Sequence, residues 1–263
     1  MNAINSKKNS QNSQNTKTTH FGFEEVHWEK KQSKVNQVFD SVASNYDLMN
    51  DLMSLGLHRL WKKFVLQIAM PKPEDFILDL AGGTGDLSLG FLPYLNQKGK
   101  IILSDINPEM LKEAQKKLDR LGIFPPSSPI ELQEINAESI PYSDNYFNLV
   151  SIGFGLRNVR DKDLALAEIF RVLKPGGRII ILEFSKPISN KFSKIYDFYS
   201  FKILPKLGKY IAKDEPAYQY LVESIRKHPD QTTLKKQMES AGFKSVQYHN
   251  LSLGIVAVHI GVK

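Results

Sequence analysis

The chain has 263 residues, of which 41% are apolar, so it can bury the core of one α/β domain. It contains no cysteine, which excludes disulfides, thiolate metal sites and cysteine nucleophiles. Its net charge of +7 is compatible with nucleic acid, an anionic membrane or an acidic small molecule as partner. No apolar run approaches the roughly 18 residues that a membrane-spanning helix needs, and the first residues lack the apolar segment of a secretory signal.

The N-terminal part of the chain divides into a polar segment and a helical one. Residues 1–20 consist almost entirely of Asn, Gln, Ser, Thr and Lys, a composition that cannot offset the entropy lost on ordering. We therefore expect a disordered polar tail over residues 1–30. Over residues 31–70 apolar residues recur at helical spacing, which predicts N-terminal helices. The first arginine is Arg59, whereas a mitochondrial transit peptide is Arg-rich, so we expect a bacterial cytoplasm as the location.

Short β-rich runs alternate with helical ones from residue 71 onward. Such alternation predicts right-handed βαβ units and a parallel sheet with helices on both faces. The last two runs are joined by a short turn with no room for a helix, which predicts a C-terminal antiparallel hairpin. The predicted strands occupy residues 76–80, 100–105, 130–135, 148–153, 178–184, 243–250 and 254–262. This seven-stranded, mostly parallel α/β arrangement is typical of the Rossmann-like class I methyltransferase fold.

A segment of different character lies before the hairpin. Between residues 186 and 231, aromatic and aliphatic residues such as Tyr196, Tyr199 and Ile203 fall at helical spacing, and lysines flank them. We predict a helical insertion over the carboxyl edge of the sheet, inside a single domain that spans residues 31–263. Its apolar face either packs on the domain or meets a membrane surface.

The first strand leads into a glycine loop, residues 82–85, within the sequence ILDLAGGTGDLS. In a doubly wound sheet, backbone can approach a ligand closely at this turn. The dinucleotide fingerprint is incomplete, because Ser88 stands at its third glycine position and Asp86 intrudes. Asp79 and Asp86 instead favour a ligand with a positively charged end, such as the ammonium group of S-adenosylmethionine (SAM). The alternative is a tight turn that needs glycine only for its backbone conformation.

Residues after the second and third strands complete a nucleotide-type site. Asp105 ends the second strand, where a carboxylate can accept both hydroxyls of a ribose. Asn136 and Ala137 follow the third strand, where the edge of an adenine would lie. SAM is therefore favoured over NAD as the cofactor. The expected contacts are Asp79, Gly82, Gly83, Gly85, Asp105, Ile106, Asn136 and Ala137.

Four further strings carry a family resemblance: YDLMNDLMSLGLHRLWK at residues 46–62, FGLRNVRDKDLAL at 154–166, RVLKPGGRIIILEFSKP at 171–187 and SIRKHPDQ at 224–231. With the glycine loop, they resemble the UbiE-type C-methyltransferases of ubiquinone and menaquinone biosynthesis, from about Val35 to the C-terminus. The first two strings are far more specific than LKPGG, which many methyltransferases share. The resemblance implies a SAM-dependent enzyme and adds Thr84 to the cofactor contacts. Gly153 is a departure, since some relatives place a cofactor-binding serine there.

The resemblance also implies methylation of a ring carbon of a polyprenylated quinol, beside a phenolic hydroxyl. Such a hydroxyl titrates at roughly 10, so the site must stabilise the phenolate or remove the proton. We assign Arg157 to phenolate stabilisation and Asn158 to orienting the ring oxygen. His228 is a candidate proton acceptor, and Tyr46 could close the pocket, although each could instead be structural. The histidines show no spacing typical of a metal site, so we expect none.

The substrate and the partners follow from the same resemblance. Candidate substrates are 2-polyprenyl-6-methoxy-1,4-benzoquinol, demethylmenaquinol or both. Because a polyprenyl chain is insoluble, we expect peripheral association with the inner membrane, with the lysines of the insertion toward anionic headgroups. A homo-oligomer or a quinone-synthesis complex is compatible with the resemblance. The alternatives are a methyltransferase acting on RNA or another small molecule, and a non-catalytic scaffold that binds SAM or a quinone. We expect no nucleic-acid partner, since no RNA-binding module is appended.

Overall fold

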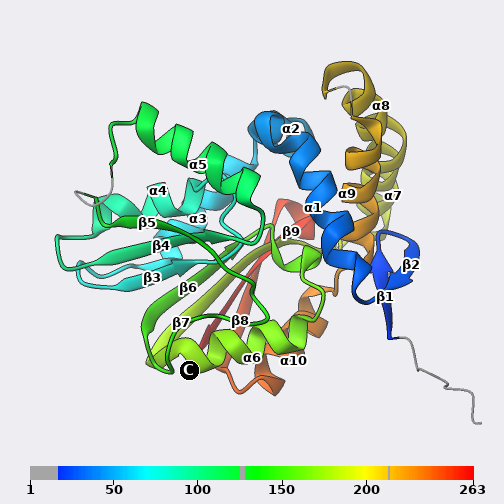
Figure 1. Cartoon of the computed structure of the whole chain (residues 1–263). Coiled ribbons are helices and arrows are strands. Elements are labelled where there is room, and N and C mark those ends of the chain that lie inside the picture. Colours follow the sequence, from blue (N-terminus) through cyan, green and yellow to red (C-terminus); the bar gives the residue numbers. More distant parts are fainter. Residues whose placement is uncertain (1–16, 125–127, 213) are drawn as a thin grey trace, which may run out of the picture.

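The computed structural model describes residues 17–124, 128–212 and 214–263, and a seven-stranded sheet forms its centre (Figure 1). The strand order is β5-β4-β3-β6-β7-β9-β8, and β9 runs antiparallel to both of its neighbours. The predicted α/β fold with a C-terminal hairpin is therefore confirmed. The strands of the sheet are β3 (Phe76–Asp79), β4 (Lys100–Asp105), β5 (Ile130–Glu134), β6 (Phe147–Gly153), β7 (Leu173–Phe184), β8 (Lys244–Leu251) and β9 (Val256–Val262).

Side chains of the strands enter two hydrophobic cores on opposite faces of the sheet. Ile77 and Leu103 belong to one core, whereas Leu78 and Ile102, their neighbours in sequence, belong to the other. This alternation follows from the twofold period of a strand, and burial on both faces explains the continuous apolar runs in the sequence. The helices on the first face are α3 (His58–Ala69), α4 (Asp86–Phe91) and α5 (Pro108–Arg120). The helices on the second are α6 (Lys162–Val172) and α10 (Gln231–Ser240).

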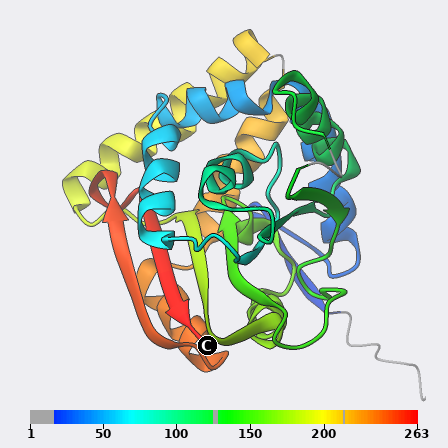
Figure 2. The same cartoon turned by 90° about the vertical axis from the view of Figure 1, so that its left-hand side faces the viewer.

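A group of further helices covers the carboxyl edge of the sheet (Figure 2). Two precede the sheet, and three come from the segment predicted as an insertion, where π-helical turns at Tyr199–Ile203 and Gly208–Ala212 flank α8. Leu204 and Tyr218 of this segment are buried in the first core, so it packs on the domain. The covering helices are α1 (Lys30–Val42), α2 (Tyr46–Ser54), α7 (Asn190–Phe198), α8 (Leu204–Leu207) and α9 (Glu215–Lys227).

Two boundaries differ from the sequence prediction by more than two residues. Part of the predicted tail, β1 (Thr18–Phe21) and β2 (Glu24–His27), forms an antiparallel hairpin. The ring of Phe21 stacks on Tyr220 of α9 at 4.2 Å, a contact to a distant element that composition could not show. Residues 1–16 of the tail lie outside the described residues. β7 begins at Leu173 rather than at residue 178, because Leu173 pairs with Phe147 before a register shift.

Candidate active site

Asp79 ends β3 and fixes the start of the glycine loop. Its side chain is fully buried, and burial raises the pKa of its carboxyl group. Its Oδ2 accepts hydrogen bonds from the backbone N and the Oγ of Ser88, at 3.0 and 2.7 Å. Its Oδ1 accepts a third from Ser151 Oγ at 2.8 Å. Asp79 therefore ties the first turn of α4 to the end of β6.

Two glycines of the loop disfavour a side chain, Gly82 through a collision and Gly83 through its backbone conformation. A Cβ on Gly82 would lie 2.5 Å from Leu103 Cδ1. Gly83 has a φ of +57°, and a Cβ there would lie 3.6 Å from the ring of Tyr46. The backbone N of Gly83 donates to Asp105 Oδ2 at 3.0 Å. The positive φ of Gly83 thus requires glycine, and the loop is joined to the end of β4.

A cavity lies beside this loop at the carboxyl edge of the sheet. The structure brings together in its lining several predicted contacts, namely Gly83, Asp105, Ile106, Asn136 and Ala137. Burial raises the pKa of Asp105 to about 6, although its oxygens accept hydrogen bonds from the backbone N atoms of Asn107 and Gly83. Above that pH, Asp105 is a carboxylate facing the cavity, able to accept hydroxyl hydrogen bonds.

Tyr46, the first residue of α2, closes this cavity from the helical cover. It lines the cavity together with Phe39 of α1, whose ring lies 6.2 Å from its own. Burial raises the pKa of the Tyr46 hydroxyl to about 12, against the opposing influence of Arg157. Tyr46 therefore stays neutral at physiological pH. Its hydroxyl can donate a hydrogen bond, but Tyr46 does not itself ionise to a phenolate.

A second, smaller cavity lies on the other side of the glycine loop. It shares Tyr46 and Phe154 with the first cavity, and Gly82 and Thr84 from the loop line it. Thr84 Oγ1 donates to Asp47 of α2 at 3.2 Å. The predicted contacts Gly82 and Thr84 thus face a different space from Asp105 and Asn136, and the two spaces adjoin.

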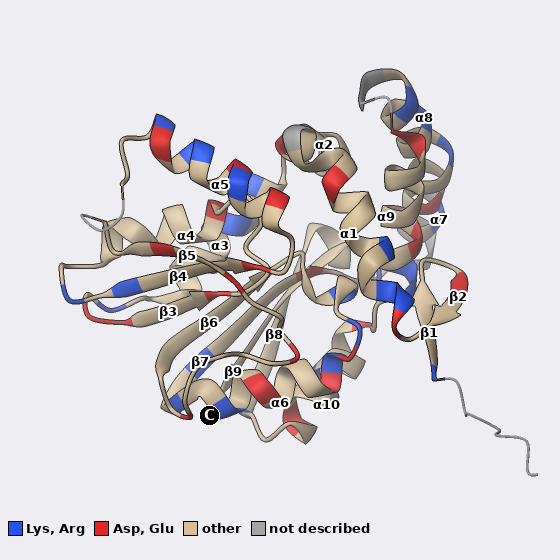
Figure 3. Ribbon diagram, viewed as in Figure 1, with Lys and Arg blue, Asp and Glu red and all other residues tan. Residues whose placement is uncertain are grey.

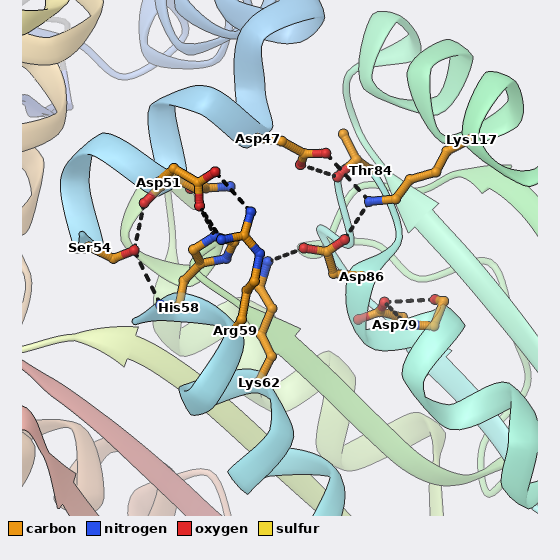
Figure 4. Close-up of polar contacts among 12 residues, drawn as sticks. Asp47, Asp51, Ser54, His58, Arg59, Lys62, Asp79, Thr84, Asp86 and Lys117 are labelled. Carbon is orange, nitrogen blue, oxygen red and sulfur yellow. Dashed lines mark hydrogen bonds and ion pairs between the residues drawn. The ribbon is translucent and has the colours of Figure 1, made fainter. Parts of the chain in front are cut away.

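Asp86 in this second cavity is paired with two lysines (Figure 4). Its Oδ2 lies 2.5 Å from Lys62 Nζ of α3, and its Oδ1 lies 2.5 Å from Lys117 Nζ of α5. Burial alone would raise the pKa of Asp86, but the two lysines outweigh it and hold that pKa well below its usual range. The expectation that Asp86 itself attracts a cationic ligand is therefore not supported, because its charge is already neutralised.

Arg157 and Asn158 lie in a short 3₁₀ turn, Leu156–Asn158, that follows β6. Arg157 is buried, and its Nη1 lies 3.0 Å from Glu183 Oε1 at the end of β7. Glu183 Oε2 also accepts from the backbone N of Arg157, so the pair fixes both side chain and main chain. Asn158 lines the first cavity, and its Oδ1 accepts from Tyr220 at 3.0 Å. This leaves the amide N–H₂ of Asn158 as the donor toward a ligand.

His228, the predicted proton acceptor, ends α9 in a buried environment. It is 3% exposed, and neither ring nitrogen has a hydrogen-bond partner in the described part of the chain. Burial, with the charges of Lys162 and Arg157, lowers its pKa well below the usual value. His228 lines neither of the two cavities. This placement gives no support to His228 as the base, since such an imidazole holds a proton weakly.

Comparison with known proteins identifies the family. The sequence profile of the ubiE/COQ5 methyltransferase family matches residues 27–263. The chain belongs to this family. It is 57% identical over 251 residues to the ubiquinone/menaquinone biosynthesis C-methyltransferase UbiE of Francisella tularensis subsp. mediasiatica, covering 95% of this chain and 99% of that one. It is 54% identical to the protein of the same name from Klebsiella pneumoniae, covering 94% and 97%. The predicted family resemblance is confirmed.

Solved structures agree on the fold. A SAM-dependent methyltransferase from Aquifex aeolicus superposes with a TM-score of 0.54 at 19% identity, covering 76% of this chain and 88% of that one. A possible histamine N-methyltransferase from Thermotoga maritima gives 0.57 at 19% identity, covering 86% and 99%. These structures show that the chain has the class I fold. As a member of the ubiE/COQ5 methyltransferase family it is, as predicted, a SAM-dependent methyltransferase.

The residues around the glycine loop fit SAM. Asp105 offers acceptors for ribose hydroxyls, and Asn136 and Ala137 line the same cavity. Gly83 lines the first cavity and Gly82 the second, so the backbone of the loop faces both spaces that a ligand could occupy. Within the described residues there is no group of three or more His, Cys, Asp or Glu side chains that could hold a metal ion.

Three residues at the site were not among the contacts predicted from the sequence. Glu183 and Lys62 were not predicted, and Gly153 was noted only as a departure from the family pattern. Gly153 lines the second cavity, and a Cβ there would lie 3.0 Å from Leu87 Cδ1. For Glu183 a signal existed, since a carboxylate at the end of an apolar strand has to find a buried partner. For Lys62 no such signal existed, because its partner Asp86 lies 24 residues away in the sequence.

Proposed function

We propose that this chain transfers the methyl group of SAM to a ring carbon of a polyprenylated quinol in ubiquinone or menaquinone biosynthesis. Its relatives of 54–57% identity carry the name of that activity and are matched over nearly their full length. The observation that carries the proposal is the position of Asn158 in the cavity of Asp105, directly after the buried Arg157. A ring oxygen held there would lie beside the amide donor of Asn158. The positive charge of Arg157, whose side chain does not line the cavity, would act on that oxygen from the adjacent residue.

Arg157 would stabilise the phenolate of the quinol. An arginine side chain stays protonated in proteins, so it can lower the energy of an oxyanion but cannot take the proton. Glu183 is a positioning residue in this proposal, because it fixes both the guanidinium and the backbone N of Arg157. Asn158 would donate its amide N–H₂ to the ring oxygen, since Tyr220 occupies its Oδ1.

The remaining residues would bind and enclose the methyl donor. When bound, SAM supplies an electrophilic methyl group on a sulfonium, and no metal is needed for its transfer. Asp105, Asn136 and Ala137 would hold its nucleoside, and Gly82, Gly83 and Thr84 would lie against the remainder. Gly85, also predicted as a contact, lines neither cavity and would act through the shape of the loop. Tyr46, at the boundary of the two cavities, would keep water from the reacting atoms.

The helical cover would meet the membrane that holds the substrate. No helix among the described residues is both long and apolar enough to cross a bilayer. A groove on the cover is lined by apolar residues and by Lys202 and Lys206. Figure 3 shows Lys and Arg, in blue, on the helices of this cover around α7 and α8. Phe198 and Tyr210 beside them are 63% and 78% exposed. We propose peripheral association with the cytoplasmic face of a bacterial inner membrane, through lysines toward anionic headgroups and rings toward the acyl boundary.

The decisive experiment supplies labelled SAM and short-chain analogues of both quinol types, kept reduced, and identifies the product by mass spectrometry. We expect one methyl group added to a ring carbon of at least one analogue. Transfer to one analogue would assign the pathway, and transfer to both would indicate a dual role. If SAM binds but neither analogue reacts, the quinol proposal fails.

Membrane association has its own test in vesicle co-sedimentation. Binding should increase with the fraction of anionic lipid and decrease with salt, because exposed lysines provide the attraction. The variant Lys202→Glu with Lys206→Glu should lose it, whereas Lys235→Glu on α10, away from the groove, should not. Binding that ignores lipid charge and salt would refute the electrostatic part of the proposal.

A further inference from the structure

The second cavity is lined by more acidic than basic side chains. Its lining contains two carboxylates, Asp79 and Asp86, and a single cation, Lys62, among the described residues that form it. The methionine part of SAM carries both an ammonium and a carboxylate group. Because the first cavity holds the residues suited to adenosine, the adjoining second cavity is where that zwitterion would lie. Its carboxylate needs a cation or a hydrogen-bond donor there.

Lys62 is held in a defined position by its helix. The neighbouring Trp61 is buried, and its Nε1 donates to Ser252 Oγ at 3.0 Å. The Trp61 ring also lies 6.1 Å from that of Phe154, which borders both cavities. The side chain of Lys62 is 14% exposed and extends from α3 to Asp86 (Figure 4). Its ammonium group is therefore fixed at the edge of the cavity rather than free in solvent.

The pairing around Asp86 leaves one cation available. Asp86 is contacted at 2.5 Å by both Lys62 and Lys117, so two positive charges share one negative charge. Lys117 also lies 3.6 Å from Asp47, but it does not line the second cavity. If Lys62 turned to another anion, Asp86 would keep Lys117 as its partner. An incoming carboxylate would then complete two ion pairs in place of one shared pair.

We propose that Lys62 binds the carboxylate of the methionine part of SAM, while Asp86 remains paired with Lys117. Gly153 lines the same cavity and brings no side-chain donor to it, so the carboxylate depends more on this contact. The proposal rests on SAM as the methyl donor and not on the identity of the quinol.

Calorimetric titration without quinol tests the proposal, using SAM and decarboxylated SAM, which lacks only the carboxylate. The protein should bind decarboxylated SAM at least about tenfold more weakly than SAM. Lys62→Met should weaken SAM by a similar factor and change the affinity for decarboxylated SAM by less than about twofold. Lys62→Arg, which keeps the charge, should restore part of the discrimination. Lys63→Met, an equal charge loss at an exposed position of the same helix, should behave as wild type.

Each other outcome overturns the assignment. Equal losses for both ligands in Lys62→Met would mean that Lys62 supports the cavity without contacting the carboxylate. Equal affinity of the unaltered protein for the two ligands would exclude any cation there, and this comparison holds even if the variant fails to fold. Because no quinol is present, failure here leaves the proposed methylation untouched, and failure of quinol methylation leaves this result untouched.

Discussion

Two ion groups at the carboxyl edge of the sheet differ in how they are enclosed and shared. In the pair of Arg157 and Glu183, one cation meets one carboxylate, and the side chains are 3% and 2% exposed. In the group around Asp86, two lysines share one carboxylate, and the side chains of Lys62, Asp86 and Lys117 are 14%, 25% and 23% exposed.

The pair of Arg157 and Glu183 is fixed, whereas the group around Asp86 can exchange one of its partners. A buried one-to-one pair cannot lose a partner without leaving a charge in a medium of low dielectric constant, so it holds its geometry. A partly exposed group in which two lysines contact one carboxylate can release one lysine at little cost, because solvent and the remaining lysine compensate. We therefore expect the first group to determine stability and orientation, and the second to respond to the ligand.

The largest effect is expected from Glu183→Gln. The change leaves the buried guanidinium of Arg157 unpaired, so the free energy of unfolding should fall by about 3 kcal/mol or more. Urea denaturation measures this loss. The matched control is Glu131→Gln, which breaks the exposed pair with Lys100 and should cost less than about 1 kcal/mol.

The double variant Glu183→Gln with Arg157→Met sharpens this prediction. It removes the unpaired charge as well, so it should be more stable than the single variant. If Glu183→Gln unfolds at the same urea concentration as the unaltered protein, the pair is not a fixed element of the fold.

The sequence predicts the fold and the loop well, because both follow from local patterns. Apolar runs of strand length and the glycines of residues 82–85 specify backbone geometry at the positions where they stand. The two ion groups depend on contacts that local patterns do not contain. Glu183 lies 26 residues from Arg157, and Lys117 lies 31 residues from Asp86.

The same limit explains two further differences between prediction and structure. Asp86 was expected to present a free charge, because its lysine partners come from other helices. His228 has an ordinary imidazole in sequence terms, and only its burial beside Arg157 and Lys162 shows that its pKa is lowered. Charge environment is a tertiary property, whereas the identity of a strand end is a local one.

The next effect concerns the function of the fixed pair. Arg157→Ala should reduce turnover at least about tenfold, or roughly 1.4 kcal/mol, while SAM affinity stays nearly unchanged. The reason is that Arg157 would act on the quinol oxygen rather than on the methyl donor. Steady-state kinetics with a quinol analogue, corrected for the folded fraction, provide the measurement. Arg178→Ala, on β7 where that strand pairs with Leu149, is the control and should retain activity. Unchanged turnover would remove Arg157 from the mechanism.

Asp105 differs from Glu183 and Asp86, because no lysine or arginine forms an ion pair with it in the described part of the structure. Its pKa is raised to about 6, and ribose hydroxyls bind its charged form, so SAM affinity should fall as the pH drops below that value. Between about pH 7 and pH 5 we expect a loss of about tenfold, with little change above pH 7. Calorimetry at several pH values measures it. Asp105→Asn should bind weakly at every pH, and a wild-type profile in that variant would exclude Asp105 as the titrating group.

The smallest effect is expected from Lys117→Met, which tests whether the second group is exchangeable. Without Lys117, Asp86 has only Lys62 and competes with the SAM carboxylate for it, so SAM affinity should fall by about threefold. Stability should change by less than about 1 kcal/mol, because the group is partly exposed. Decarboxylated SAM should bind this variant as it binds the unaltered protein, since it does not compete for Lys62.

Asp47→Asn, which removes the other partner of Lys117, controls for loosening of α2 and should leave the ratio of the two affinities unchanged. An equal loss for both ligands in Lys117→Met would mean that the lysines of this group act only through the position of the loop, and the contrast with the buried pair would then be one of exposure alone.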